Sequence, residues 1–148
     1  MTAKQYLSQA IRIRLLIRQT KEHMKELEEL AGSPPPIRYD REIVQSSGSG
    51  DQMIRTLIQL EAEERRCKRL LEGYIEKYIE ITENIRKVMP GLYSDVLYMR
   101  YIEGKNLEKI AKELNYSYEW IRHIHGRALQ AFRKKFPELC KDDTQKHK

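Results

Sequence analysis

The chain has 148 residues and a formal net charge of +6, from 28 Lys and Arg against 22 Asp and Glu. Few Gly and Pro residues beside abundant Leu, Ile, Glu, Lys and Arg indicate an all-α protein, of one domain or two small ones. Its two cysteines form neither a disulfide framework nor a metal-binding spacing. No apolar run approaches membrane-spanning length, and the N-terminus lacks the apolar core of a signal peptide. A cytoplasmic protein without a membrane partner is therefore expected.

A first helical segment is predicted at residues 2–31, where apolar residues recur at alternating steps of three and four. Gly32 and the prolines after it cannot continue this helix, because proline lacks a backbone N–H and restrains the residue before it. The predicted linker covers residues 32–50, which is long enough for the chain to reverse direction.

A second, longer helix is predicted from Asp51, as its N-cap, to about Met89. Its apolar stripe continues for about five heptads, as in a coiled coil. The stripe consists of Met53, Leu57, Leu60, Glu64, Cys67, Leu71, Tyr74, Tyr78, Ile81, Ile85 and Val88. Such a seam needs a partner, which is the first helix in an antiparallel hairpin, a second copy of the chain, or both. We favour both, and therefore expect a homodimer formed through the helical region.

Three short helices are predicted after a break at Pro90 and Gly91. Each begins at a polar residue suited to an N-cap. The expected caps are Ser94 or Asp95 for a helix ending at Gly104, Asn106 for a helix at 107–114, and Ser117 for a helix ending near Phe136, with Asn115 and Tyr116 as the turn between the last two. The predicted domains are thus a helical hairpin or coiled coil at 1–89, a helix-turn-helix domain at 90–138 and a disordered tail at 139–148.

The last two helices carry facing apolar stripes, and the small Ala111 allows their axes to approach closely. The stripes are Ile110, Ala111 and Leu114 on the first helix, and Ile121, Ile124 and Ala128 on the second. This pattern is typical of a helix-turn-helix, whose second helix lies in the major groove of DNA. Between Ser117 and Phe136 there are five basic residues and one acidic residue, which suits a polyanionic partner.

The segment from Asp95 to Lys134 resembles region 4 of bacterial sigma factors. Three stretches carry the resemblance: Val96-Leu-Tyr-Met-Arg-Tyr-Ile-Glu-Gly104 is similar to the first helix of that family, Leu107-Glu-Lys-Ile-Ala-Lys-Glu-Leu114 to its scaffold helix, and Ser117-Tyr-Glu-Trp-Ile-Arg-His-Ile-His-Gly-Arg-Ala-Leu129 to its recognition helix. Asn115 replaces the glycine common at the turn, and asparagine also tolerates the left-handed conformation. No part of the chain resembles sigma region 2, which melts promoter DNA.

The whole arrangement, with a long hairpin before a region 4-like domain, is similar to small phage and prophage regulators of late-gene transcription. The resemblance implies a sequence-specific DNA-binding transcription regulator. Its implied partners are a promoter-like double-stranded DNA site and bacterial RNA polymerase.

Helix geometry predicts which side chains meet the DNA. If Ile121 and Ile124 point inward, the polar residues at the start of the last helix point outward. Arg122 is suited to guanine O6 and N7, and Glu119 to a cytosine amino group. The expected DNA-binding residues are Ser117, Tyr118, Glu119, Arg122, His123 and Arg127, together with Lys105, Asn106 and Lys109 near the start of the preceding helix, where phosphates meet basic side chains and helix N–H groups.

Other roles remain open for some of these residues. Glu119 and Arg122 are three apart, and the alternative to DNA contact is an ion pair between them on a solvated face. Trp120 is expected to pack against the first helix of the domain. The basic residues at the end of the last helix form a solvated face, a phosphate strip or a polymerase-binding surface; they are Arg127, Arg133, Lys134 and Lys135.

Two further functions compete with transcription regulation. A small terminase-like subunit for DNA packaging also joins a helix-turn-helix to helical oligomerisation segments, and a pure interaction protein would bind polymerase rather than DNA. An enzyme is not expected, because the sequence has no Gly-rich phosphate loop and no nucleophile beside a plausible base. No cofactor or metal is predicted, since His123 and His125 are two apart and cannot form a helical metal pair.

Overall fold

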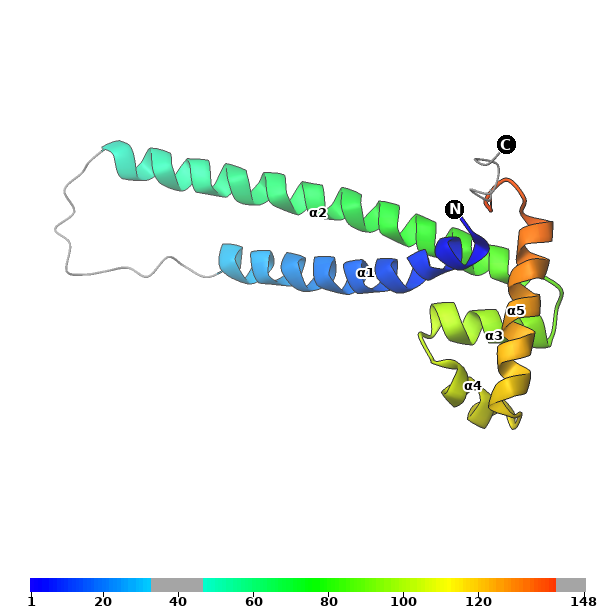
Figure 1. Ribbon diagram of the computed structural model, residues 1–148. Helices are drawn as coiled ribbons and strands as arrows, with labels where there is room; N and C mark the ends of the chain where they lie inside the picture. The colour runs from blue at the N-terminus through cyan, green and yellow to red at the C-terminus, as the bar shows by residue number, and fades with distance from the viewer. Residues whose placement is uncertain (33–46, 141–148) are drawn as a thin grey trace. The chain divides into compact units, whose positions relative to one another are not determined.

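The computed structural model describes residues 1–32 and 47–140, and within these ranges all regular secondary structure is helical. The prediction of an all-α protein is therefore confirmed. In chain order the elements are α1 (Ala3–Gly32), α2 (Ser47–Lys87), α3 (Leu92–Leu97), a π-helical turn η1 (Tyr98–Ile102), α4 (Leu107–Leu114) and α5 (Tyr118–Lys135). The α-helices are labelled in Figure 1. Most of the predicted linker and tail, residues 33–46 and 141–148, lies outside the described residues. None of the helices described is long and apolar enough to cross a membrane.

The chain divides into two units, and α1 and α2 each contribute a segment to both. One unit, which we call the C-terminal unit, combines Met1–Leu15 with Ile75–Lys148; the other, the hairpin unit, is Leu16–Tyr74. The C-terminal unit therefore contains the start of α1 and the end of α2 as well as the three short helices.

Within the hairpin unit, the segments of α1 and α2 lie side by side and run in opposite directions (Figure 1). Leu27 and Cys67 are buried, and His23 of α1 lies 3.3 Å from Glu63 of α2. The start of the α2 seam remains open to solvent, with exposed fractions of 51% for Met53 and 46% for Leu57. The seam is thus covered in part only.

Two predicted helix starts are wrong. α2 begins at Ser47, four residues before Asp51, because extending an existing helix by one residue costs far less than nucleating it. α3 begins at Leu92 without a side-chain cap, since Gly91 adopts φ 116° and leads the chain directly into the helix. Ser94, expected as a cap, donates its hydroxyl to the backbone oxygen of Ile85 at 3.3 Å instead.

The helix-turn-helix core forms where α3 and α4 pack against α5 (Figure 1). The buried cluster consists of Val96, Ile110, Ala111, Ile121 and Ile124. Ile110 and Ala111 come from α4 and Ile121 and Ile124 from α5, as their helical spacing predicts. Leu114 is half-buried at the edge of the cluster.

The end of α5 has a separate anchor at the start of α1. The Tyr6 ring, 2% exposed, lies 5.6 Å from the Phe132 ring. Asn84 Nδ2 donates to the Tyr6 hydroxyl at 3.0 Å, and that hydroxyl donates to Glu80 at 3.2 Å. Burial raises the pKa of Tyr6 to about 12, so the hydroxyl keeps the proton that it donates.

Arg14 of α1 stabilises the end of η1. Its Nη1 donates to the backbone oxygens of Ile102 and Glu103 at 3.0 and 3.1 Å. Carbonyls at the end of a helix have no partner within the helix, and a guanidinium satisfies them. The chain then leaves the helix through Gly104, at φ 72°.

We predict that Ala111→Leu lowers the free energy of unfolding by about 1–3 kcal/mol, because the larger side chain has no room between α4 and α5. Ala111 is 4% exposed. Denaturant unfolding of the full chain measures this effect. The control is Lys112→Leu at the neighbouring exposed position, which should change stability by no more than about 0.5 kcal/mol. Equal losses in the two variants would contradict close packing at Ala111.

Candidate nucleic-acid interface

Two side-chain caps and one left-handed residue set the angle between α4 and α5. Asn106 Oδ1 accepts from the backbone N–H of Lys109 at 2.8 Å, and Ser117 Oγ accepts from that of Trp120 at 3.1 Å. Asn115 lies at φ 60°, and the N–H of Tyr116 donates to the backbone oxygen of Ala111 at 2.9 Å. This is a Schellman-type helix end with asparagine in place of glycine. The predicted caps and turn are confirmed.

The outer face of α5 brings together four of the predicted DNA-binding side chains, Glu119, Arg122, His123 and Arg127. With Ile121 and Ile124 buried, the intervening residues point to solvent. A shallow hollow on this face is lined by Glu119, Arg122, His123, Gly126, Arg127 and Gln130, all exposed. Sequence reasoning missed Gly126 and Gln130, although both follow Arg122 at helical spacing. Gly126 leaves open space here, since a Cβ added to it would meet nothing within 4 Å.

Arg122 has no hydrogen bond or ion pair within the part of the chain that the structure describes, and the same holds for Glu119. The alternative of an ion pair between these two side chains is therefore not what the structure contains. An exposed guanidinium with five unused N–H groups is chemically suited to a guanine edge or a phosphate.

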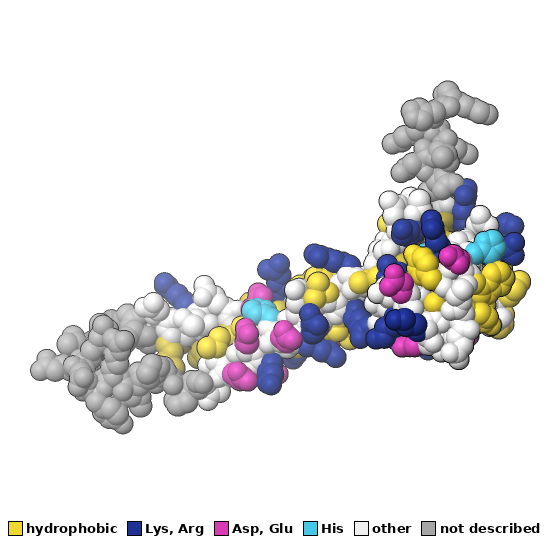
Figure 2. Space-filling model, turned by 60° about the horizontal axis from the view of Figure 1, so that its bottom comes forward, with side chains coloured by type: hydrophobic (Ala, Val, Ile, Leu, Met, Phe, Trp, Pro, Cys, Tyr) yellow, Lys and Arg dark blue, Asp and Glu magenta, His cyan; other side chains and the backbone are white. Residues whose placement is uncertain are grey.

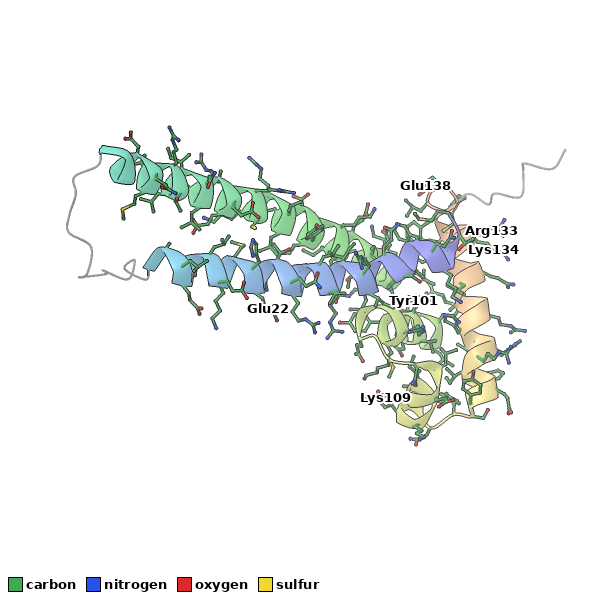
Figure 3. The ribbon with its side chains drawn as sticks, turned by 60° about the vertical axis from the view of Figure 1, so that its left-hand side comes forward. Glu22, Tyr101, Lys109, Arg133, Lys134 and Glu138 are labelled. Carbon is green, nitrogen blue, oxygen red and sulfur yellow. The ribbon has the colours of Figure 1, made fainter. Side chains whose placement is uncertain are left out.

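The three predicted residues near the start of α4 differ in their surroundings. Lys105 Nζ pairs with Glu103 at 2.5 Å and with Glu113 at 2.7 Å, and these two carboxylates raise the pKa of Lys105. Its charge is thus compensated within the protein. Lys109 is exposed on α4 (Figure 3), and Asn106 is exposed at the cap.

Exposed aromatic side chains lie around the N-terminal end of α5. Tyr116, Tyr118 and Trp120 are exposed by 48%, 44% and 44%. The expectation that Trp120 packs against the first helix of the domain is wrong: its ring lies 5.7 Å from the exposed ring of His123, one turn further along α5. Figure 2 shows yellow side chains beside dark-blue and cyan ones on this part of the molecule. The face therefore combines positive charge with exposed rings.

The basic residues of the last turn of α5 lie away from the hollow. Arg133 and Lys134 are labelled near the end of α5 in Figure 3, where Glu138 also lies. Arg133, Lys134 and Lys135 are exposed and stand at the negative end of the helix dipole. Arg127, in contrast, lines the hollow with Arg122.

His125 has a structural role that its position in the sequence did not indicate. Its Nε2 lies 2.8 Å from the hydroxyl of Tyr101, and the two rings are stacked with centroids 5.7 Å apart. Burial lowers the pKa of His125, as do the nearby charges of Arg100 and Lys4. Burial also raises the pKa of Tyr101 to about 12. A neutral imidazole nitrogen is therefore available to the Tyr101 hydroxyl, which joins η1 to α5.

Comparison with protein families matches residues 88–134 to the family described as Sigma-70, region 4. The match covers α3, η1, α4 and nearly all of α5, and it confirms the predicted sigma region 4-like domain. This family binds DNA through its helix-turn-helix. Comparisons with curated proteins and with solved structures found no significant match.

We predict that the chain loses stability as the pH falls below about 6.5, in part through His125. The unfolded chain takes up this proton near pH 6.5, whereas the folded chain binds it only at lower pH, so acid favours unfolding. Denaturant unfolding at about pH 7.5 and about pH 5.5 measures the loss. In His125→Gln, which keeps a hydrogen-bonding group but does not titrate there, the loss should be smaller. An unchanged loss would contradict this assignment.

Proposed function

We propose that the region 4 domain at residues 88–134 reads a promoter-like DNA site with the outer face of α5, and that the protein is a sequence-specific transcription regulator. The observation that carries this proposal is the division of α5 into two faces. Ile121 and Ile124 are buried by 96% or more, while Arg122 between them is exposed and has no partner in the described residues. The family match at the same residues supports it.

In this proposal Arg122 contacts a guanine edge, and Glu119, His123 and Arg127 complete the contacts along the groove. Ser117 and Tyr118 lie at the start of the helix, where backbone N–H groups face a phosphate. Lys109 and Asn106 hold the opposite strand from the start of α4. Lys105 positions the α4 segment through its two carboxylate partners rather than contacting DNA.

We further propose control of phage or prophage late genes through contact with bacterial RNA polymerase. The resemblance of the whole arrangement to such regulators supports this assignment. The exposed basic turn at Arg133, Lys134 and Lys135 is a surface that polymerase could use without blocking the DNA-reading face. Mapping the DNA that the protein occupies in a host that carries the gene tests this proposal. Binding at sites scattered without regard to promoters would contradict it.

The partner of the exposed seam is, in our proposal, a second copy of the chain. Four large apolar side chains at the start of α2 are exposed by 46–57%: Met53 and Leu57 of the seam, and Ile54 and Ile58 beside it. A contiguous group of this kind is costly in water and is normally covered. A homodimer through this segment would also present two DNA-reading domains to a two-part site.

Replacing Arg122 by alanine should cost about 1–3 kcal/mol of binding free energy at the cognate site and leave binding to random DNA nearly unchanged. Fluorescence anisotropy on a site selected from random duplexes measures both. Lys109→Ala should instead weaken binding to the cognate site and to random DNA alike. It should also reduce by about one the slope of the log binding constant against the log salt concentration. Arg55→Ala, which removes the same charge from the hairpin unit, is the control for net charge. If Arg122→Ala weakens both equally, Arg122 contacts only phosphate.

We predict that Leu57→Glu separates the dimer, because a carboxylate cannot be buried in an apolar seam without a partner. Light scattering during size-exclusion chromatography should give twice 17.7 kDa for the unmodified chain and 17.7 kDa for the variant. The adjacent exposed substitution Gln59→Glu adds the same charge outside the seam and should leave the dimer intact. A monomer for both the unmodified chain and Leu57→Glu would contradict the proposal. A large ring formed by the unmodified chain would favour DNA packaging.

A further inference from the structure

Three metal-ligating side chains meet within the hairpin unit. His23 comes from α1, while Glu63 and Cys67 are one turn apart on α2, and one ligand atom of each lies within 4.8 Å of the other two. Figure 2 shows a histidine beside acidic side chains on these helices. We propose that His23, Glu63 and Cys67 bind a Zn²⁺ ion, with water as the fourth ligand.

The distances between the ligand atoms fit such an ion. His23 Nε2 lies 3.3 Å from Glu63 Oε1, and Cys67 Sγ lies 3.7 Å from the same oxygen. In a tetrahedral zinc site with bonds of about 2.0–2.3 Å, neighbouring ligand atoms are about 3.3–3.6 Å apart. Two of the three separations between ligand atoms are therefore close to those of a zinc site, and the third is at most 4.8 Å.

The chemistry of the three atoms selects the metal. A thiolate, an imidazole and a carboxylate together suit Zn²⁺, whereas Mg²⁺ and Ca²⁺ require oxygen ligands. Without metal, burial raises the pKa of Cys67, and its thiol donates to Glu63. Binding releases that proton to solvent and leaves a Zn–S bond.

Exposure of the site leaves room for the fourth ligand. Cys67 is 3% exposed and closes the inner side, while the side chains of His23 and Glu63 are 47% and 39% exposed. Water can therefore reach the open side of the ion. Because the ligands come from both helices, the ion would hold α1 and α2 together across the linker and stabilise the hairpin unit.

Cobalt substitution of the metal-free full-length chain tests the site. We expect one Co²⁺ per chain, with a thiolate-to-cobalt charge-transfer absorption that Zn²⁺ displaces and Mg²⁺ does not. Cys67→Ser should abolish this absorption and Cys140→Ser should keep it. Retention of the band in Cys67→Ser would overturn the proposal, as would the absence of any binding.

Two further substitutions keep the test valid if Cys67→Ser does not fold. His23→Gln and Glu63→Gln alter half-exposed side chains, and each should weaken Zn²⁺ binding at least about tenfold, because loss of an outer-shell partner alone commonly costs 10–100-fold. Glu22→Gln is the matched control, since Figure 3 shows Glu22 on the side of α1 that faces away from α2. At the same concentration, Zn²⁺ should raise the melting temperature of the control more than that of His23→Gln. If all three variants bind as tightly as the unmodified chain, His23 and Glu63 contact each other without binding the metal, and the proposal is overturned.

Discussion

The rotation of α5 about its own axis is the constraint on which the composition of its outer face depends. Ile121 and Ile124 must enter the cluster with Val96 and Ile110, and successive residues on a helix are turned by a fixed angle. Once these isoleucines are buried, the geometry of the helix makes the Arg122 side chain point outward. Ala111 contributes by being small, because close approach of α4 is what encloses Ile121. The chemistry of the outer face is thus a consequence of packing on the inner one.

The same helix is held at three levels along its length. The apolar cluster holds its first two turns, the hydrogen bond between Tyr101 and His125 holds the next, and Phe132 packs against Tyr6 near its end. A surface element fixed in this way loses little conformational freedom when it meets a ligand. Rigidity of α5 therefore favours affinity and selectivity without adding a single contact.

Local patterns in the sequence predicted the features that depend only on residues close together in the chain. The isoleucine spacing, the caps at Asn106 and Ser117 and the left-handed Asn115 all follow from a few adjacent positions. Contacts between distant segments left no such pattern. Tyr6 and Phe132 are 126 positions apart, so no periodicity connects them, and the same is true of His23 and Cys67, which we propose as metal ligands. The prediction that Trp120 packs on the first helix of the domain was wrong because its ring contacts His123 on its own helix.

The contact of Tyr6 with Phe132 affects how the protein is made. A ribosome releases a chain from its N-terminal side, so the start of α1 emerges before α5. The ring of Tyr6 can therefore meet Phe132 only after α5 has emerged, and the guanidinium of Arg14 can meet its carbonyl partners only after η1 has emerged. Closing a loop between segments so far apart in the chain costs entropy and slows folding. The C-terminal unit is therefore completed only after α5 has emerged.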